Sequence, residues 1–379
     1  MSSADRPATR LATRLSFLVA GFGLAAWAPL VPYAKSRLGV DEGALGLLLL
    51  CLGLGSVLAM LAAGPLTARF GSRPVIVIGG AGMALLLPML AIAPTPLTLG
   101  VALFGFGAFL GAMEVGMNIH AVEVEKAGGR PMMAGFHGLF SIGGFFGSTI
   151  MTLWLSASLG AAWGTAISAL VMLVLLAVAY PRLLTHVHVE KAPLFVAPKG
   201  LVLLLAGLAT ITFLAEGAIL DWSALLLTGT GLVNEAQGGL GYMVFAIAMT
   251  FGRLTGDWVT VRLGDRQMMF WGGIIAVAGF IVLLLAPVAA VALLGFGLIG
   301  LGASNVVPVL FRQAGNQKDM PSGLAVAAIT TTGYAGILVG PAGVGFVAHG
   351  IGLPSAFWII AGLMCLVPVC AHIVTRARA

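Results

Sequence analysis

The sequence predicts an all-α integral membrane protein in which twelve transmembrane helices form two six-helix halves. Of its 379 residues, 60% are hydrophobic and only 8% are charged, whereas an ordinary soluble domain carries about 25% charged residues. Apolar stretches long enough to cross a bilayer recur along the whole chain, and the basic residues gather at alternate ends of these stretches. These observations argue against a water-soluble globular protein, a disordered chain and a nucleic-acid-binding protein.

The predicted helices are continuous apolar stretches of bilayer-spanning length. A helix needs ~20 mostly apolar residues to cross ~30 Å of hydrocarbon, about twice the length of a barrel strand. A lipid-immersed backbone must satisfy its own hydrogen bonds, so we expect helices here rather than strands. The stretches run over 14–34, 44–64, 74–93, 98–121, 133–156, 161–180, 200–228, 237–257, 268–287, 289–311, 322–347 and 354–374.

The basic residues predict the orientation in the membrane. Seventeen of the 19 Lys and Arg residues, Arg253 among them, precede the first span or lie at or after the even-numbered spans, and only Lys35 and Arg37 fall at the opposite ends. Because cytoplasmic loops carry an excess of Lys and Arg, we expect both termini in the cytoplasm and the protein in the bacterial inner membrane. The first span is too long for a signal-peptide core and has no convincing cleavage site, so it is expected to be retained.

An internal repeat divides the sequence. A shift of 190 residues aligns Gly105-Phe106-Gly107 with Gly295-Phe296-Gly297, and a slightly larger shift aligns Arg69-Phe70-Gly71 with Arg262-Leu263-Gly264. The matches fall at corresponding places in the two halves of the series of spans. This pattern predicts that the halves are structural repeats of one another.

Two helical bundles of similar size are therefore expected. The N-terminal bundle covers residues 1–180, the C-terminal bundle covers 200–379, and the polar stretch 181–199 is expected to form a cytoplasmic linker. Parallel halves related by an axis along the membrane normal are an architecture of secondary transporters.

The segment between the second and third spans carries a loop motif. Gly64-Pro65-Leu66-Thr67-Ala68-Arg69-Phe70-Gly71-Ser72-Arg73 resembles the signature of the major facilitator superfamily, roughly Gly-x-Leu-x-Asp-Arg-x-Gly-x-Arg/Lys. The resemblance implies a loop that helps to latch the two halves together. Ala68 replaces the carboxylate of the signature, and Asp257 at the end of the eighth span is a candidate for a similar role in the other half. The residues assigned to this cytoplasmic gate are Arg69, Gly71, Arg73, Asp257 and Arg262.

Further segments resemble the fucose-permease-like branch of this superfamily. In that branch a carboxylate of the fourth helix is implicated in proton coupling, and Glu114 falls on its position. The resemblance covers nearly the whole chain and implies the fold and a transport activity, but not the substrate. Its segments are Glu114 to Asn118, Gly129-Arg130-Pro131 with Phe136-His137, Glu216-Gly217-Ala218 with Asp221-Trp222, and Asn305 to Pro308.

From the sequence alone, Glu114 is the leading candidate for a functional ionisable residue. It lies about sixteen residues into its span, near the bilayer midplane at ~1.5 Å per residue, and ionisable groups at such depth are costly and suggest function. It is expected to carry the coupled proton or, alternatively, to hold neighbouring helices by hydrogen bonds. Asn118 lies one turn further on the same face and can bind a hydroxyl-rich solute or join helices. His120 faces elsewhere and is expected at the membrane interface.

Other side chains within the spans complete the predicted site, each with a structural alternative. His137 is a candidate for proton relay or substrate binding, and Glu216 for both roles. Asp221 lies five residues after Glu216 and does not share its face. Asn305 is close to the repeat counterpart of the fourth-span carboxyl group. Trp27 can stack on a sugar or fill the bundle, ahead of two prolines that are expected to break the first helix.

These features predict a secondary active transporter that works by alternating access. Proton-coupled symport of a small, sugar-like polar solute is the expected activity, and proton-driven export of amphipathic or drug-like compounds is the alternative. No enzyme activity, metal or cofactor is expected, because the sequence has no phosphate-binding loop, zinc motif or nucleophile elbow. The expected partners are the solute, protons and the lipid bilayer, without nucleic acid, and the chain is expected to act as a monomer. Proton coupling is assigned to Glu114, His137 and Glu216, and substrate binding to Trp27, Asn118, His137, Glu216, Asp221 and Asn305.

Overall fold

The computed structural model describes residues 6–27, 29–40, 42–157, 160–185, 198–233 and 240–376. Within these residues every regular element is a helix, as the apolar stretches predicted. Most of the linker predicted over 181–199 lies outside the described residues. The chain divides into two compact units. Unit 1 comprises Met1–Arg130, Phe136–Ala197 and Pro321–Ala327, and unit 2 comprises Pro131–Gly135, Pro198–Met320 and Ala328–Ala379.

Unit 1 is a helical bundle built mainly from the N-terminal half of the chain. The first six predicted spans all fall on helices of unit 1. The first of these spans is divided between two helices, α1 and α2. The helix α5 has 33 residues, about 50 Å at 1.5 Å per residue, so it is longer than the hydrocarbon layer is thick. The elements are α1 (Pro7–Trp27), α2 (Leu30–Leu38), α3 (Glu42–Phe70), α4 (Ser72–Ile92), α5 (Pro96–Gly128), α6 (Met133–Ser156), α7 (Ala161–Ala179) and the short 3₁₀ helix η2 (Tyr180–Arg182).

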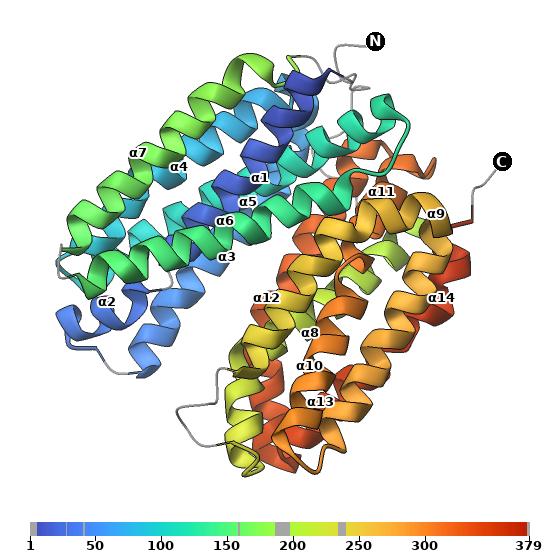
Figure 1. Cartoon of the computed structure of the whole chain (residues 1–379). Coiled ribbons are helices and arrows are strands. Elements are labelled where there is room, and N and C mark those ends of the chain that lie inside the picture. The colour runs from blue at the N-terminus through green and yellow to red at the C-terminus, as the bar shows by residue number, and fades with distance from the viewer. Residues whose placement is uncertain are drawn as a thin grey trace. The chain divides into compact units, whose positions relative to one another are not determined.

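Unit 2 contains the helices of the C-terminal half, apart from the first turns of α12, which belong to unit 1. The long helix α9 holds two predicted spans as two arms that meet at Gly264 (Figure 1). Among the described residues, nine helical segments are long and apolar enough to cross a membrane, α9 counting as one; α1 and α12 account for the other two predicted spans. The elements are α8 (Leu201–Gly229), α9 (Leu240–Leu284), α10 (Ala289–Ala303), α11 (Val306–Asn316), α12 (Ser322–Ile351), α13 (Leu353–Met364) and α14 (Leu366–Val374).

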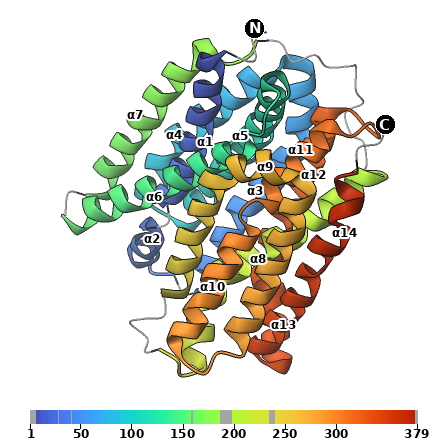
Figure 2. The same cartoon turned by 45° about the vertical axis from the view of Figure 1, so that its right-hand side comes forward.

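Prolines lie at the breaks of the first and tenth predicted spans. Pro29 separates α1 from α2, as expected for a residue that cannot donate a backbone hydrogen bond. Pro308 lies in the first turn of α11, and the predicted tenth span is divided there into α10 and α11 (Figure 2). Pro308 has no N–H for the carbonyl group of Ser304, four residues earlier. That carbonyl is therefore available to a donor from another helix.

Two glycines occupy corresponding positions in the repeat. Gly71 precedes α4 with φ 85° and ψ 165°, and Gly264 joins the arms of α9 with φ 78° and ψ 161°. This backbone region is essentially restricted to glycine. The two aligned glycines therefore make the same turn, which supports the internal repeat.

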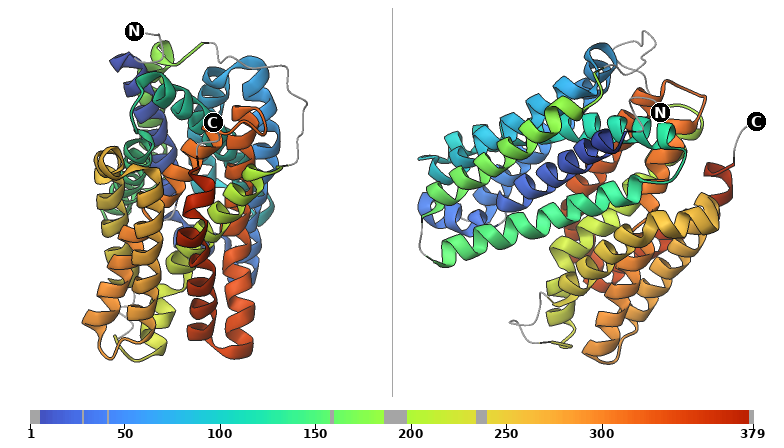
Figure 3. Two further views of the ribbon diagram at one scale, coloured as in Figure 1. Left: turned by 90° about the vertical axis from the view of Figure 1, so that its right-hand side faces the viewer. Right: turned by 45° about the horizontal axis from the view of Figure 1, so that its top comes forward.

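Glycines also allow α1 and α6 to pack backbone to backbone in unit 1, where the two helices lie side by side (Figure 3, right). A Cβ atom at Gly143 would lie 2.2 Å from the carbonyl oxygen of Leu18, and one at Gly21 would lie 2.0 Å from that of Phe140. Small residues at helix interfaces are the usual device for close packing in membranes. In unit 2, the hydroxyl group of Thr210 donates to the carbonyl of Thr332 at 3.0 Å and joins α8 to α12, the repeat counterparts of α1 and α6.

Gly143→Ala is expected to lower the midpoint of thermal unfolding in detergent micelles. The added methyl group has no space, and overpacking of this kind costs about 1–3 kcal/mol. Gly144→Ala is the matched control, because a Cβ there would meet its nearest neighbour at 3.8 Å, an ordinary contact. Alanine is also the better helix former by about 1 kcal/mol, so the control is expected to be neutral or stabilising. Equal midpoints for the two variants would contradict this account of the interface.

Candidate functional site

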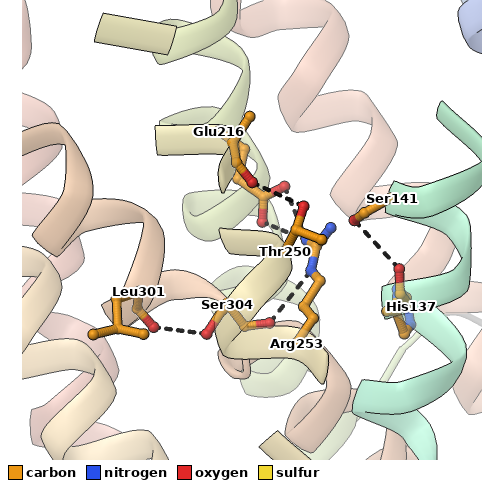
Figure 4. Close-up of polar contacts among 8 residues, drawn as sticks. His137, Ser141, Glu216, Thr250, Arg253, Leu301 and Ser304 are labelled. Atoms are coloured by element: carbon orange, nitrogen blue, oxygen red, sulfur yellow. Dashed lines mark hydrogen bonds and ion pairs between the residues drawn. The ribbon is translucent and has the colours of Figure 1, made fainter. Parts of the chain in front are cut away.

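A buried ion pair lies in unit 2, between α8 and α9. Nη2 of Arg253 donates to both carboxylate oxygens of Glu216, at 3.4 Å to Oε1 and 3.3 Å to Oε2 (Figure 4). The side chains are 10% and 19% exposed, respectively. The sequence analysis counted Arg253, at the eighth span, with the basic residues of the cytoplasmic side, and it did not foresee this pairing. Arg253 lies well inside α9, and its charge is compensated within the protein.

The helix break at Pro308 helps to hold Arg253. Nε of Arg253 donates to the freed carbonyl oxygen of Ser304 at 3.4 Å, while the hydroxyl group of Ser304 donates to the carbonyl of Leu301. Figure 4 shows these contacts converging on Arg253 from the end of α10. The guanidinium group is thus anchored on one side by backbone and faces the carboxylate of Glu216 on the other.

Asn305 lies at the same break and joins α9 to α11. Its Nδ2 donates to the carbonyl of Gly252 at 2.8 Å and to the hydroxyl of Ser304 at 2.9 Å. A Cβ at Gly256 would lie 1.8 Å from Oδ1 of Asn305, so the amide packs directly on the α9 backbone. Both donor contacts serve the helix junction, which favours the structural alternative; substrate binding by Asn305 stays a prediction.

Glu114 and Asn118 are buried midway along α5 in unit 1, with 4% and 2% exposure. Nδ2 of Asn118 donates to the backbone carbonyl of Glu114 at 2.8 Å. Gly111 lies on the same flank of α5, against the backbone and hydroxyl group of Ser56 in α3. Oδ1 of Asn118 and Oγ of Ser56 are buried without a hydrogen-bond partner among the described residues. The flank of α5 that faces α3 therefore combines a carboxyl group with polar atoms inside an otherwise apolar bundle.

The remaining residues of the predicted site lie on α1, α6 and α8. His137 of α6 packs edge-on against Phe17 of α1, with ring centroids 5.1 Å apart, and its backbone carbonyl accepts from Ser141 at 3.4 Å. Trp27 of α1 is 4% exposed, and its indole N–H has no partner among the described residues. The side chain of Asp221 lies outside the described residues.

Asp257 binds the start of α6 within unit 2. Its two carboxylate oxygens accept the backbone N–H groups of Ala134 at 3.1 Å and Gly135 at 2.7 Å. These N–H groups belong to the first turn of α6, where helical N–H groups have no partner in the helix. A carboxylate there also interacts favourably with the positive end of the helix dipole. Asp257 thus binds backbone donors at the start of α6, and its gating role stays a prediction.

The repeat counterpart of Asp257 is Gly64, and its surroundings are apolar. A Cβ at Gly64 would lie 2.6 Å from Cβ of Ala327 and 3.7 Å from Leu324, both in the first turns of α12 and both in unit 1. The start of α12 corresponds to the start of α6 in the repeat. One copy of the repeat therefore uses a carboxylate on a helix N-terminus, and the other uses close contact between small residues.

Asp257→Asn is expected to speed hydrogen exchange at the N–H groups of Ala134 and Gly135 by about tenfold. The substitution removes the charge, and a charged acceptor makes a hydrogen bond worth about 1.5–3 kcal/mol, against about 1 for a neutral one. Exchange is measured by mass spectrometry on the protein in nanodiscs. The first turn of α12 is the internal control and should keep its rate. Unchanged exchange at the start of α6 would show that the contact does not hold this helix.

The other predicted gate residues make local contacts. The guanidinium group of Arg73 lies 3.7 Å from the ring centre of Tyr180, and that of Arg262 lies 3.5 Å from the ring centre of Trp258. Arg69 lies 5.1 Å from the ring of Phe70. These cation–π contacts leave the proposed gating role of the arginines as a prediction.

The sequence analysis missed two polar clusters. In unit 2, Nη1 of Arg312 donates to Oδ1 of Asp265, and Nε2 of Gln313 donates to Oδ2 at 2.6 Å. Asp265 directly follows Gly264 in the repeated turn, and this position was the available signal. In unit 1, His120 is fully buried.

His120 connects three segments of unit 1. Its Nε2 accepts the backbone N–H of Leu184 at 3.1 Å, so Nδ1 carries the proton and donates to the hydroxyl group of Thr13 at 3.2 Å. The imidazole is therefore in a single neutral tautomer that joins α5 to α1 and to the residues after η2. Both ring nitrogens serve structure.

Comparisons with known proteins bear on the fold and the family. The sequence matches the Major Facilitator Superfamily over residues 15–318. An uncharacterized MFS-type transporter of Yersinia pestis is 48% identical over 368 residues, which cover 97% of this chain and 96% of that protein. The membrane protein MosC of Rhizobium meliloti is 33% identical, covering 96% of this chain and 89% of that protein.

A partial match and a solved structure add to these. The triacylglyceride transporter of Mycobacterium tuberculosis is 30% identical over 172 residues, 40% of this chain and 32% of that protein. The fucose:proton symporter FucP of E. coli has the same fold, with a TM-score of 0.77 and 17% identity over 99% of this chain and 100% of that chain. The predicted fold is confirmed. The chain belongs to the major facilitator superfamily and is a membrane transporter with a fucose-permease-like fold, not an enzyme.

Proposed function

We propose that the protein is a proton-coupled symporter of a small polar organic solute in the bacterial inner membrane, with both termini in the cytoplasm. The observation that carries the proposal is the burial of Glu114 halfway along a membrane-spanning helix, beside Asn118. An ionisable group at this depth is costly and is kept for a function such as proton transfer. The fold shared with a fucose:proton symporter agrees with this activity.

The proposed cycle uses the protonation state of the buried carboxyl groups. Glu114 takes up a proton from the side of higher proton concentration, and Glu216 and His137 take part in the same coupling. The solute binds near Trp27 and Asn118 in unit 1. The binding site of the loaded carrier then opens to the cytoplasm, and the solute and the proton are released there. Asp257 holds the start of α6 in one of the two access states, outward-open or inward-open, between which the carrier alternates.

Purified protein in liposomes provides the test of this function. A thermal-shift screen of small polar solutes first identifies a ligand, since a ligand stabilises the folded state by RT ln(1 + [L]/Kd). The ligand is then added outside liposomes that contain a trapped pH dye. Symport is expected to acidify the interior only when protein and ligand are both present. Uptake of the ligand without acidification would contradict proton symport.

Proton-driven export of amphipathic compounds is the second candidate. It is supported by the partial similarity to a triacylglyceride transporter. Everted membrane vesicles with an acidic interior separate the two activities. An exporter drives uptake of an amphipathic dye into such vesicles, whereas the proposed symporter does not.

A further inference from the structure

Three buried hydroxyl groups of unit 1 differ from the other helical hydroxyl groups. In the helices of this protein a buried hydroxyl group commonly donates to the carbonyl group four residues earlier, as Thr165 does to Ala161 at 2.9 Å. Ser56, Thr67 and Ser72 make no such bond, although they are only 2%, 1% and 0% exposed. Their hydroxyl oxygens have no partner among the described residues. These groups are therefore available to a partner outside the chain.

The first of these hydroxyl groups lies where α3 packs on α5. A Cβ at Gly107 would meet the carbonyl oxygen of Leu52 at 1.8 Å. Four residues later along both helices, a Cβ at Gly111 would meet the carbonyl oxygen of Ser56 at 2.3 Å and its hydroxyl oxygen at 2.7 Å. The two helices therefore run in the same direction in a fixed register. Asn118 lies two turns after Gly111 on the same face of α5, and its Oδ1 is also without a partner among the described residues.

The other two hydroxyl groups continue this series beyond Asn118. The register of α3 and α5 puts Thr67 one turn further, about 6 Å along the axis. The helix α4 runs in the opposite direction, and a Cβ at Gly116 of α5 would lie 3.1 Å from Val75. Ser72, one turn before Val75, therefore lies at a depth between Asn118 and Thr67. A single bridging water spans such steps, because each of its hydrogen bonds is about 2.7–3.2 Å long.

Ionisable side chains do not connect Glu114 to the end of α3. The segments that line this stretch, 52–68 of α3 and 74–92 of α4, contain no ionisable residue. On α5, His120 follows Asn118, but both of its ring nitrogens are bound, to Thr13 and to the backbone of Leu184. The other ionisable residues of these elements and of α1 are Glu42, Cys51 and Arg69 on α3, Arg73 on α4, Glu123, Glu125 and Lys126 on α5, and Arg10 and Arg14 on α1.

Ordered water is the partner that such groups take. Buried polar atoms are seldom left unsatisfied, and those without a protein partner normally bind a buried water molecule. A water molecule and a hydroxyl group each donate and accept hydrogen bonds. A chain of them can therefore pass a proton along by exchanging hydrogen bonds, which an apolar helix interface cannot do.

We infer that the interface of α5 with α3 and α4 holds a chain of ordered water, bound by Asn118, Ser72 and Thr67, through which Glu114 releases its proton to the cytoplasm. This inference rests on the proposed proton coupling and orientation, and it gives the proton a path separate from that of the solute. The carboxyl O–H bond of Glu114 breaks, and the neighbouring water accepts the proton. Each further water or hydroxyl group accepts one proton and gives up another. One proton thus reaches cytoplasmic water, and Glu114 is left as a carboxylate.

X-ray footprinting tests for the water itself. Ionising radiation converts bound water into hydroxyl radicals, which oxidise adjacent side chains, and mass spectrometry gives the rate at each residue. Met60 lies one turn after Ser56 on the same face of α3. Met83 of α4 is the matched control, because both methionines are 0% exposed and Met83 packs against Gly23 of α1. With the full chain in nanodiscs, Met60 is expected to be oxidised several-fold faster than Met83.

The rate at which Glu114 loses its proton tests the route. The carboxyl infrared band that is absent in Glu114→Gln is followed after a rapid jump to alkaline pH. Thr67→Val removes the hydroxyl group and is expected to slow the loss of the proton by about tenfold, or about 1.4 kcal/mol on the barrier, without moving the titration midpoint. Thr67→Ser should restore the rate. Thr165→Val is the matched control, because Thr165 is also buried but donates within its own helix.

Equal oxidation of Met60 and Met83 would show that the interface is dry and would overturn the inference, as would an unchanged rate in Thr67→Val. The proposed function has a separate readout, the accumulation of solute that depends on Glu114. If accumulation depends on Glu114 while Thr67→Val keeps the wild-type rate, the coupling stands and the route is wrong. If Met60 is oxidised and Thr67→Val is slow while accumulation does not depend on Glu114, the route stands and the coupling proposal fails.

Discussion

Arg253→Gln is expected to be among the most destabilising single substitutions in unit 2. It leaves the carboxylate of Glu216 buried without its cation, and breaking one side of a buried ion pair costs about 3–5 kcal/mol. It also removes the donor to the carbonyl of Ser304 at the break between α10 and α11. The midpoint of thermal unfolding in detergent should fall strongly near neutral pH. The loss should be smaller in acid, where Glu216 can take up a proton and become neutral.

The double variant Glu216→Gln/Arg253→Gln separates the effect of breaking the ion pair from the effect of altered side-chain packing. It removes both charges and keeps side chains of similar size, and replacing both members of a buried pair is often close to neutral. Most of the stability lost in Arg253→Gln should therefore return, apart from the contact with Ser304. Additive effects of the two single substitutions would mean that the pair makes no net interaction. That result would contradict a stabilising interaction between Arg253 and Glu216.

The sequence predicted the fold because the bilayer imposes strong rules on composition. A span must be apolar and about 20 residues long, and each of the twelve predicted spans falls on helices of the described residues, two of them on the arms of α9. The proline rule located the break between α1 and α2. The repeated Arg-x-Gly turns identified Gly71 and Gly264, which share their backbone angles. These features depend on local sequence alone.

The candidate site was less predictable, because it depends on which helix faces which. The positive-inside rule counts basic residues near the ends of spans, and it treated Arg253 only as one more cytoplasmic-side charge. Only the packing of α8 on α9 reveals that this charge is paired with Glu216. From the sequence, Asn305 is likewise only a polar residue within a span. In the structure its side-chain N–H group donates to the backbone of α9. Apolar sequence patterns carry no information on such pairings.

The contact of Asp257 was predictable in part. Its position near the end of a span was visible in the sequence, and its likeness to the missing carboxylate of the loop motif suggested a latch. The backbone N–H groups of Ala134 and Gly135 that it binds carry no sequence signal. The apolar counterpart at Gly64 and Ala327 became visible only through packing. The repeat is therefore symmetric in backbone but asymmetric in the chemistry of this contact.

Glu114→Gln is expected to abolish accumulation of solute against its gradient. Glutamine keeps the size and hydrogen-bonding capacity of the side chain but cannot carry a proton. A carrier with a permanently neutral side chain should still bind the solute and exchange it across the membrane. Counterflow of labelled solute is therefore the control for folding and binding, and it is expected to stay within about threefold of the wild type.

The most direct test of proton coupling compares the wild type and Glu114→Gln in liposomes with an alkaline interior. The solute is the ligand identified by thermal shift, and its internal concentration is followed over time. The wild type is expected to concentrate the solute inside while the pH gradient lasts, and Glu114→Gln is expected only to equalise the two concentrations. Accumulation by Glu114→Gln to the level of the wild type would contradict the assignment of the coupled proton to Glu114.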